Sequence, residues 1–454
     1  METHVLILLL FSPKYVLVKW AILGGGLTGV TLARLLKEKG HEVTVLEKEP
    51  KIGGLCRSEK RNGFTFDCGG SHIIFSRDTE VLSFMQNVLA ENREFRDRNT
   101  KIFYKGQYVK YPFENGLSAL PKEDLFFCIN EYVKNLVAVE KGEVPEPTSF
   151  KDWIYYTFGK GIAECYLVPY NEKIWNYPTD KMSKHWMDGR VPRPPVEDII
   201  KSAVGIETEG YTHQAVFSYP IEGGIEALIH AIAKPIIKSI KTNYTVTSVV
   251  NTGDGWAVSN GKETILADRV ISTLPLQTLL PMLHVPPQIK EACDALRYNS
   301  IACISVGFKG TAPDISWMYV PEEKWGAFNR LSFPSNFSSQ VAPAGCSAVL
   351  AEITYNEGDD VSKMNDEELI MHTVDGLVRM GIIPSSDDVV HTAVDHFEFA
   401  YVVYDLEYLK NIKIVRDYLE KTIGVDLVGR FSEFEYINMD GCIRSVMNFV
   451  EKNT

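Results

Sequence analysis

The chain lacks the sequence marks of several common protein classes. Its eight cysteines include no Cys-x-x-Cys pair and no spacing typical of a metal site, so neither a zinc site nor a disulfide scaffold is expected. Acidic residues outnumber basic ones, and the formal net charge of −12 argues against nucleic acid as a partner. There is also no repeat and no low-complexity tract. We therefore expect a globular protein with reduced thiols, located in the cytoplasm.

Long apolar runs are missing too. Residues 5–11 are apolar but too few to span a bilayer, and Glu2 and His4 precede them where a signal peptide carries basic residues. We interpret this run as an extension ahead of the first strand. A mis-assigned start and a weakly membrane-contacting tail are the open alternatives, and no transmembrane segment is expected.

Glycine, in contrast, is concentrated near the start of the chain. Residues 24–29 fit the pattern Gly-x-Gly-x-x-Gly, an apolar strand is predicted at 16–23, and a helix is predicted at 30–39. Glu47 closes the next apolar run. This strand, glycine turn, helix and acidic residue are the parts of a dinucleotide-binding βαβ unit.

The residue types explain what such a unit would bind. Glycines allow a pyrophosphate to approach the helix N-terminus, where free amides and the helix dipole favour negative charge. A carboxylate at Glu47 can accept hydrogen bonds from ribose hydroxyls and would repel a 2′-phosphate, which argues against NADP. The sequence therefore predicts a site for FAD or NAD.

The pattern of predicted elements divides the chain into interleaved units. We expect one nucleotide domain built from residues 14–78, 205–285 and 401–454, with a helical insertion at 79–204 and a strand-rich insertion at 286–400. The class is α/β. Such a layout favours a ligand cleft between the domains.

The glycine fingerprint is followed by Gly53, Gly54 and Arg57, and a Gly-Arg-Phe segment lies at 429–431. Together they resemble FAD enzymes with a glutathione-reductase-like Rossmann domain, a group that includes amine oxidases, protoporphyrinogen oxidases and UDP-galactopyranose mutases. The resemblance implies FAD as the cofactor. It also implies the fold: this Rossmann domain with an inserted helical domain and an inserted antiparallel sheet.

The helical insertion narrows the resemblance. Residues 111–115, 169–175, 178–182 and 189–191 are similar, in order, to UDP-galactopyranose mutases, especially those of the eukaryotic type. Such enzymes interconvert UDP-galactopyranose and UDP-galactofuranose, with N5 of reduced FAD as the nucleophile. The resemblance implies a UDP-sugar substrate and an external reductant such as NAD(P)H or a reduced electron carrier.

The resemblance also assigns site residues. Arginine suits a pyrophosphate leaving group because its planar fork donates paired hydrogen bonds and stays charged. The catalytic residues implied are His72, Arg190 and Arg330. The substrate-binding residues implied are Tyr111, Phe113, Glu114, Tyr166, Asn171, Trp175, Gln214, Trp317, Tyr319, Tyr401 and Tyr436. FAD contacts are expected from Gly24, Gly26, Leu27, Thr28, Gly29, Glu47, Lys48, Gly53, Gly54, Leu55, Arg57, Gly70, Ser71, His72, Val246, Thr273, Arg430, Asp440, Gly441 and Cys442.

The chain departs from the mutase pattern at several places. Glu114 stands where the family has an amide, so an ionised side chain would offer only acceptors to a uracil edge. Gln214 stands near an expected Asn, and Ser71 lengthens the Gly-Gly-His loop by one residue. Two other functions therefore stay open: an FAD oxidase or desaturase related to amine and protoporphyrinogen oxidases, and a flavin-binding partner protein without turnover.

Overall fold

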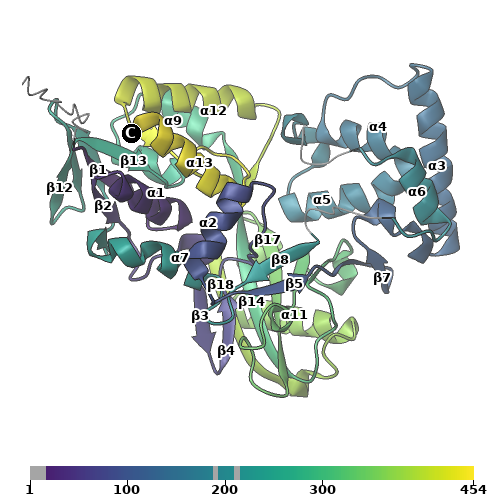
Figure 1. Cartoon of the computed structure of the whole chain (residues 1–454). Helices are drawn as coiled ribbons and strands as arrows, with labels where there is room; N and C mark the ends of the chain where they lie inside the picture. Colours follow the sequence, from purple (N-terminus) through teal and green to yellow (C-terminus); the bar gives the residue numbers. More distant parts are fainter. Residues whose placement is uncertain (1–16, 188–192, 209–214) are drawn as a thin grey trace, which may run out of the picture.

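The computed structural model describes residues 17–187, 193–208 and 215–454 and places a parallel sheet at its nucleotide end (Figure 1). The strand order is β19-β13-β1-β2-β9, and every pairing is parallel. The strands are β1 (Lys19–Leu23), β2 (Glu42–Leu46), β9 (Ile240–Lys241), β13 (Arg269–Ser272) and β19 (Asp426–Leu427). As in other parallel sheets, the central strand is an almost unbroken apolar run, buried on both faces.

Helix α1 (Leu27–Glu38) links β1 to β2, which confirms the βαβ unit expected from the glycine pattern. Helices α7 (Glu226–Ala233) and α13 (Met439–Asn453) pack against α1. A three-stranded antiparallel meander, β10 (Ser248–Asn251), β11 (Trp256–Ser259) and β12 (Thr264–Ala267), lies beside the sheet. Segments from the beginning, middle and end of the chain therefore build one unit.

A second, seven-stranded sheet lies below the nucleotide unit in Figure 1, in the order β18-β14-β17-β16-β15-β6-β7. Its strands are β6 (Thr100–Tyr104), β7 (Gln107–Lys110), β14 (Arg297–Lys309), β15 (Trp317–Tyr319), β16 (Arg330–Ser332), β17 (Cys346–Tyr355) and β18 (Val389–Val403). All pairings are antiparallel except β15 with β6, which is parallel. Helix α11 (Asp366–Arg379) contacts β14 and β18.

A group of helices forms the right-hand part of Figure 1. It comprises α3 (Lys122–Glu140), α4 (Phe150–Ile162), α5 (Val168–Trp175) and α6 (Val196–Ala203), with a π-helical turn at Ala163–Leu167. The side chains of Ser149 and Asp152 form a capping box at the start of α4. Nowhere in the described ranges is a helix both long and apolar enough to cross a membrane.

The remaining elements join these units. They are α2 (Thr79–Leu89), α8 (Leu276–Leu279), α9 (Pro287–Asp294), α10 (Asp360–Lys363), α12 (Tyr408–Arg416), β3 (Ser58–Arg61), β4 (Phe64–Asp67), β5 (Glu94–Asp97) and β8 (Val216–Tyr219). Helix α2 packs on α7 and α13, and β6 and β7 belong to the seven-stranded sheet. The stretch 79–204 thus contributes to all three parts of the molecule, although its domain bounds stay a prediction.

Candidate functional site

A cavity of about 690 Å³ opens at the carboxyl ends of the parallel strands. Gly24 follows β1, Glu47 follows β2 and Thr273 follows β13, and all three line it. The opposite wall comes from the seven-stranded sheet, through residues such as Trp317 and Arg330. Ligands of open α/β sheets bind at this edge, where successive strands end.

At Gly24 and Gly29 the glycine turn leaves no room for a side chain. A Cβ atom on residue 29 would lie 1.9 Å from the carbonyl oxygen of Gly24, and Gly24 itself has a φ of +100°. The N-cap of α1, Gly26, makes no side-chain capping bond, so the first amides of the helix are open to a ligand. Gly26, Leu27 and Thr28 line the cavity at this point. These features fit the pyrophosphate of a dinucleotide.

Glu47 is held firmly at the same end. Its carboxylate accepts hydrogen bonds from the backbone amides of Gly25 (2.6 Å) and Glu49 (2.9 Å), and the residue is 8% exposed. Lys48, Gly53, Gly54, Leu55, Arg57 and Val246 line the cavity around it. The arrangement leaves a fixed acceptor beside the glycine turn, as a ribose requires.

A second helix N-terminus faces the cavity. Asn438, the N-cap of α13, lines it together with Cys442 and makes no side-chain capping bond. The guanidinium of Arg430 lies nearby and donates to the carbonyls of Ala400 and Ile437, both at 2.7 Å. The helix dipole and this half-buried cation together favour negative charge here.

In the wall formed by the seven-stranded sheet, a central residue is one that the sequence did not single out, Glu352 on β17. Its fully buried carboxylate accepts a paired interaction from Arg330 on β16, with Nη2 at 2.6 and 2.7 Å and Nε at 3.0 Å. It also accepts a hydrogen bond from the backbone amide of Ser71 at 3.1 Å. Burial opposes the charge of Arg330, but the adjacent carboxylate outweighs it and holds the pKa of Arg330 well above its ordinary value.

His72 follows in the same loop and lines the cavity. Its Nδ1 donates to the carbonyl of Gly70 at 2.8 Å, which leaves Nε2 as an acceptor. Burial lowers the pKa of His72 to about 4, and nearby Arg330 and Arg430 act in the same direction. At neutral pH the imidazole is therefore uncharged. Its Nε2 can accept a hydrogen bond, but the ring contributes no positive charge to the cavity.

Aromatic rings and a cation lie together in the cavity wall near the seven-stranded sheet. The ring of Tyr111 lies 5.0 Å from that of Tyr319, and the Arg98 guanidinium lies over Tyr111 (5.2 Å) and Trp317 (4.8 Å). All four residues line the cavity.

Across the cavity, the rings of Tyr401 and Tyr436 are 5.6 Å apart, and Arg430 lies 4.7 Å from the Tyr436 ring. Tyr319 on β15 pairs directly with Arg330 on β16, and Tyr401 lines the same cavity. The structure therefore brings a cation and two pairs of hydroxylated rings to one place.

Several predicted substrate residues lie behind this surface and do not line the cavity. Tyr166 stacks between Phe113 (4.9 Å) and Tyr170 (5.2 Å) within the helical core. The Asn171 amide donates to Leu167 at 2.7 Å and accepts from the Trp175 indole at 3.1 Å. Binding roles for these residues stay predictions.

The other predicted residues fall into three groups. Glu114 is buried beside Phe113 and outside the cavity lining. Gly29 lies in the first turn of α1, Asp440 and Gly441 lie in the first turn of α13, and Gly70 lies in the loop after β4; none of them lines the cavity. Arg190 and Gln214 lie outside the described residues.

Sequence reasoning missed Glu352 and Arg98. A signal for Glu352 was present, because it is the lone carboxylate within the apolar run of β17, and a buried charge requires a partner. Arg98 carries no comparable local signal. Its position depends on the pairing of β6 with β15, which joins distant parts of the chain.

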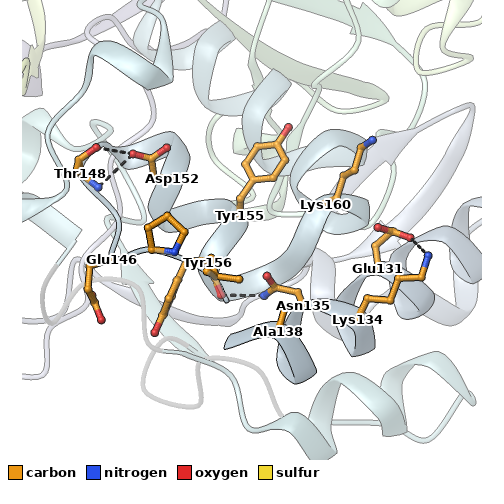
Figure 2. A pocket seen from close by; sticks show the side chains of 12 residues that line it. Glu131, Lys134, Asn135, Ala138, Glu146, Thr148, Asp152, Tyr155, Tyr156 and Lys160 are labelled. Atoms are coloured by element: carbon orange, nitrogen blue, oxygen red, sulfur yellow. Dashed lines mark hydrogen bonds and ion pairs between the residues drawn. The ribbon is translucent and has the colours of Figure 1, made fainter. Parts of the chain in front are cut away.

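A second, more open hollow lies between α3 and α4 (Figure 2). Several of its polar groups are paired with one another or with the backbone: Glu131 pairs with Lys134 at 2.8 Å, Asp152 caps α4, and Asn135 donates to the carbonyl of Tyr156 at 2.9 Å. We therefore place the functional site in the larger cavity.

Comparison with known families now identifies the fold and cofactor. The family described as flavin containing amine oxidoreductase matches residues 27–411. The chain belongs to this family. Its members bind FAD, and the glycine cradle, the two open helix N-termini and the fixed Glu47 carboxylate fit that cofactor.

Solved structures place this family member more closely. A crystal structure of reduced UDP-galactopyranose mutase is 26% identical, with a TM-score of 0.86 and 96% of each chain covered. A putative protoporphyrinogen oxidase from Exiguobacterium sp. shares the fold at 17% identity and a TM-score of 0.74, with 96% and 98% of the two chains covered. The family member is thus a mutase-like flavoprotein of the amine oxidase superfamily, with the expected fold class.

Sequence relatives match over short segments. An uncharacterised protein in the nifH2 3′ region of Methanothermococcus thermolithotrophicus is 39% identical over 79 residues, which is 17% of this chain and 76% of that protein. A 4,4′-diapophytoene desaturase of Staphylococcus aureus is 44% identical over 56 residues, or 12% of this chain. The match spans only 11% of the desaturase.

Proposed function

We propose that this protein is an FAD-dependent sugar-nucleotide mutase that interconverts UDP-galactopyranose and UDP-galactofuranose. The observation that carries the proposal is the group of Arg330, Tyr319 and Tyr401 on the substrate side of the cavity, because these are donors suited to a diphosphate. The similarity to reduced UDP-galactopyranose mutase over 96% of the chain supports the same function.

The chemistry requires a nucleophile, a stabilised diphosphate and control of a proton. When bound in its reduced form, FAD supplies the nucleophile, so no side chain has to attack the sugar. Arg330 holds positive charge at the diphosphate, and its pairing with Glu352 fixes the direction of the remaining N–H groups. Keeping the UDP group bound in one position favours its return to the same sugar.

Neutral His72 is suited to the proton step. With Nδ1 committed to Gly70, its Nε2 can accept a hydrogen bond from a sugar hydroxyl during ring opening. Because the pKa of His72 is about 4, the imidazole is a weak base and orients a hydroxyl more than it removes its proton. We therefore assign His72 an orienting role at the reacting sugar.

An oxidase of the amine oxidase type is the second candidate, favoured by the family match. Such an enzyme takes a hydride from its substrate and needs oxidised flavin. The cationic residues Arg98, Arg330 and Arg430 make the cavity a poor place for an apolar polyene or an ammonium substrate. This charge pattern supports the mutase.

The deciding experiment is anaerobic. Dithionite-reduced holoenzyme is incubated with UDP-galactofuranose, and UDP-galactopyranose is separated by chromatography. We expect conversion with the reduced enzyme and none with the oxidised enzyme. No conversion by enzyme with bound, reduced FAD would rule out the mutase.

A variant pair locates the activity in the cavity. Arg330→Lys keeps a cation but removes the forked interaction with Glu352, so turnover and UDP affinity should both fall. Arg416→Lys on α12 is the matched control, since Arg416 lies outside the cavity lining and pairs with Glu420. UDP should perturb the flavin absorbance of the control and perturb that of Arg330→Lys less.

A further inference from the structure

A buried lysine on α5, Lys173, lies close to the functional site without lining the cavity. Its side chain is 5% exposed, and the carboxylate that pairs with it, that of Glu323, is 3.9 Å away and itself 74% exposed. Lysine is rarely buried without a close partner, because taking an ammonium group out of water is costly. Burial lowers the pKa of Lys173 to about 8, with Glu323 and Glu322 opposing the shift, so the amine is mostly charged at pH 7. The position of this cation requires an explanation.

Two backbone carbonyls accept hydrogen bonds from the ammonium group. The Nζ atom of Lys173 donates to the carbonyl of Val320 at 3.1 Å and to that of Gly326 at 2.8 Å. Both carbonyls lie in the loop between β15 and β16, which begins directly after Tyr319 and ends directly before Arg330. The side chain of Lys173 therefore ties α5 to this loop.

The backbone of the same lysine is tied to the other end of the loop. Its carbonyl accepts a hydrogen bond from the Thr354 hydroxyl on β17 at 3.0 Å, and the Asn329 side-chain amide donates to that hydroxyl at 3.3 Å. Asn329 directly precedes Arg330. One residue of α5 is thus connected to the chain just after Tyr319 and to the chain just before Arg330.

Helix α5 also supports tyrosines that line both sides of the cavity. The ring of Tyr170 lies 5.2 Å from that of Tyr319. The ring of Trp175 lies 6.0 Å from that of Tyr401 and 5.2 Å from that of Tyr436. Tyr170 and Trp175 lie on α5, on either side of the buried lysine in sequence. The position of α5 relative to the loop therefore affects the distance between the tyrosines across the cavity.

We propose that Lys173 is a positioning residue for the diphosphate, which fixes the hairpin of β15 and β16 against α5 and so sets where Tyr319 and Arg330 lie in the cavity. Because Lys173 is outside the cavity lining, its effect passes through the residues that it holds. Donors that are held in place before binding reduce the entropic cost of fixing an anion and keep it in a reactive geometry. This role rests on the proposed mutase function.

The test compares Lys173→Met with Lys110→Met in the FAD-loaded full-length chain, with UDP as the probe. Methionine keeps most of the length and the apolar stem but has no N–H group. Lys110 on β7 is the matched control, because its ammonium also donates to a backbone carbonyl, that of Thr208 at 2.8 Å, and lies near an exposed carboxylate, that of Glu207 at 3.6 Å. In titrations followed by flavin absorbance, Lys173→Met should bind UDP about tenfold more weakly than wild type. Lys110→Met should bind it as wild type does.

A double-mutant cycle separates positioning from a general loss of stability. In Arg330→Lys the paired interaction with Glu352 is already lost, so adding Lys173→Met should weaken UDP binding by only about twofold. A lysine that acts independently of the hairpin would instead give its full tenfold effect in this background as well. Full additivity, or an equal loss of affinity in Lys110→Met, would overturn the proposal.

A measurement without ligand keeps this role distinct from the mutase function. The backbone amide of Val320 donates to the carbonyl of Asn329 at 2.9 Å and closes the hairpin. Amide hydrogen exchange of peptides covering residues 320–329 should be about tenfold faster in Lys173→Met than in wild type or Lys110→Met. If wild type binds no UDP, the mutase function fails, and unchanged exchange in Lys173→Met would overturn the positioning role in either case.

Discussion

Glu114 offers a sharp test of how burial sets a charge in this protein. It lies in the 3-10 helix Phe113–Asn115, is 6% exposed, and burial raises its pKa from 4.5 to about 7, with only its own backbone amide opposing the shift. Replacing it by the amide in Glu114→Gln keeps the size and removes the charge.

The sign and magnitude follow from linkage. Between pH 4.5 and about 7 the folded protein holds a proton on Glu114 that the unfolded chain has released, so the free energy of unfolding falls as pH rises through this window. At about 1.4 kcal/mol per pH unit, the full difference is about 3 kcal/mol. Because Glu114→Gln has no carboxyl group that titrates at this position, its free energy of unfolding should rise relative to that of wild type as pH rises.

Urea unfolding at several pH values between 5 and 8 measures the difference. We expect the advantage of Glu114→Gln over wild type to grow by about 2 to 3 kcal/mol across this range. Glu143→Gln is the control, because Glu143 is exposed in the loop after α3 and its difference from wild type should stay flat. A flat difference for Glu114→Gln as well would refute the buried-carboxylate reasoning.

The same titration bears on substrate recognition. When protonated, a carboxylic acid can donate as well as accept, and it then resembles the amide found at this position in mutases. If Glu114 takes part in the uridine site, UDP affinity should fall from pH 6 to pH 8 in wild type and stay constant in Glu114→Gln. Equilibrium titration with UDP checks this result.

Three further outcomes are expected. Gly29→Ala should abolish FAD retention, measured by flavin absorbance after gel filtration, because the new Cβ would lie 1.9 Å from the Gly24 carbonyl oxygen. Glu352→Gln should lower the free energy of unfolding by about 3 to 5 kcal/mol in urea titrations, because it leaves Arg330 without its charge partner. As pH falls from 6.5 towards 4, the unfolded chain binds a proton on His72 before the folded protein does, so the free energy of unfolding of wild type should fall. His72→Gln should not show this fall. Melting temperatures compared at pH 5 and pH 7 would measure it.

Local sequence signals predicted the local parts of this fold well. The glycine turn and the helix after it depend on neighbouring residues, and both are present, although α1 begins at Leu27, three residues before the predicted start at residue 30.

The seven-stranded sheet was harder to predict. The parallel pairing of Thr100 with Trp317 joins residues more than two hundred positions apart, and no local pattern marks it. The site residues divide in the same way. Those of the glycine turn follow from local backbone geometry, whereas the neighbours of Arg330 depend on the register of β16 against β17.

That register also links the cofactor side of the site to the substrate side. Glu352 accepts from Arg330 on β16 and from the backbone of Ser71, which precedes His72 in the loop next to the flavin site. A shift of this loop would therefore alter the hydrogen bonds of Glu352 and, through them, the direction of the Arg330 N–H groups. A single buried carboxylate outside the cavity lining thus gives the flavin-side loop a physical connection to the cation proposed to hold the diphosphate.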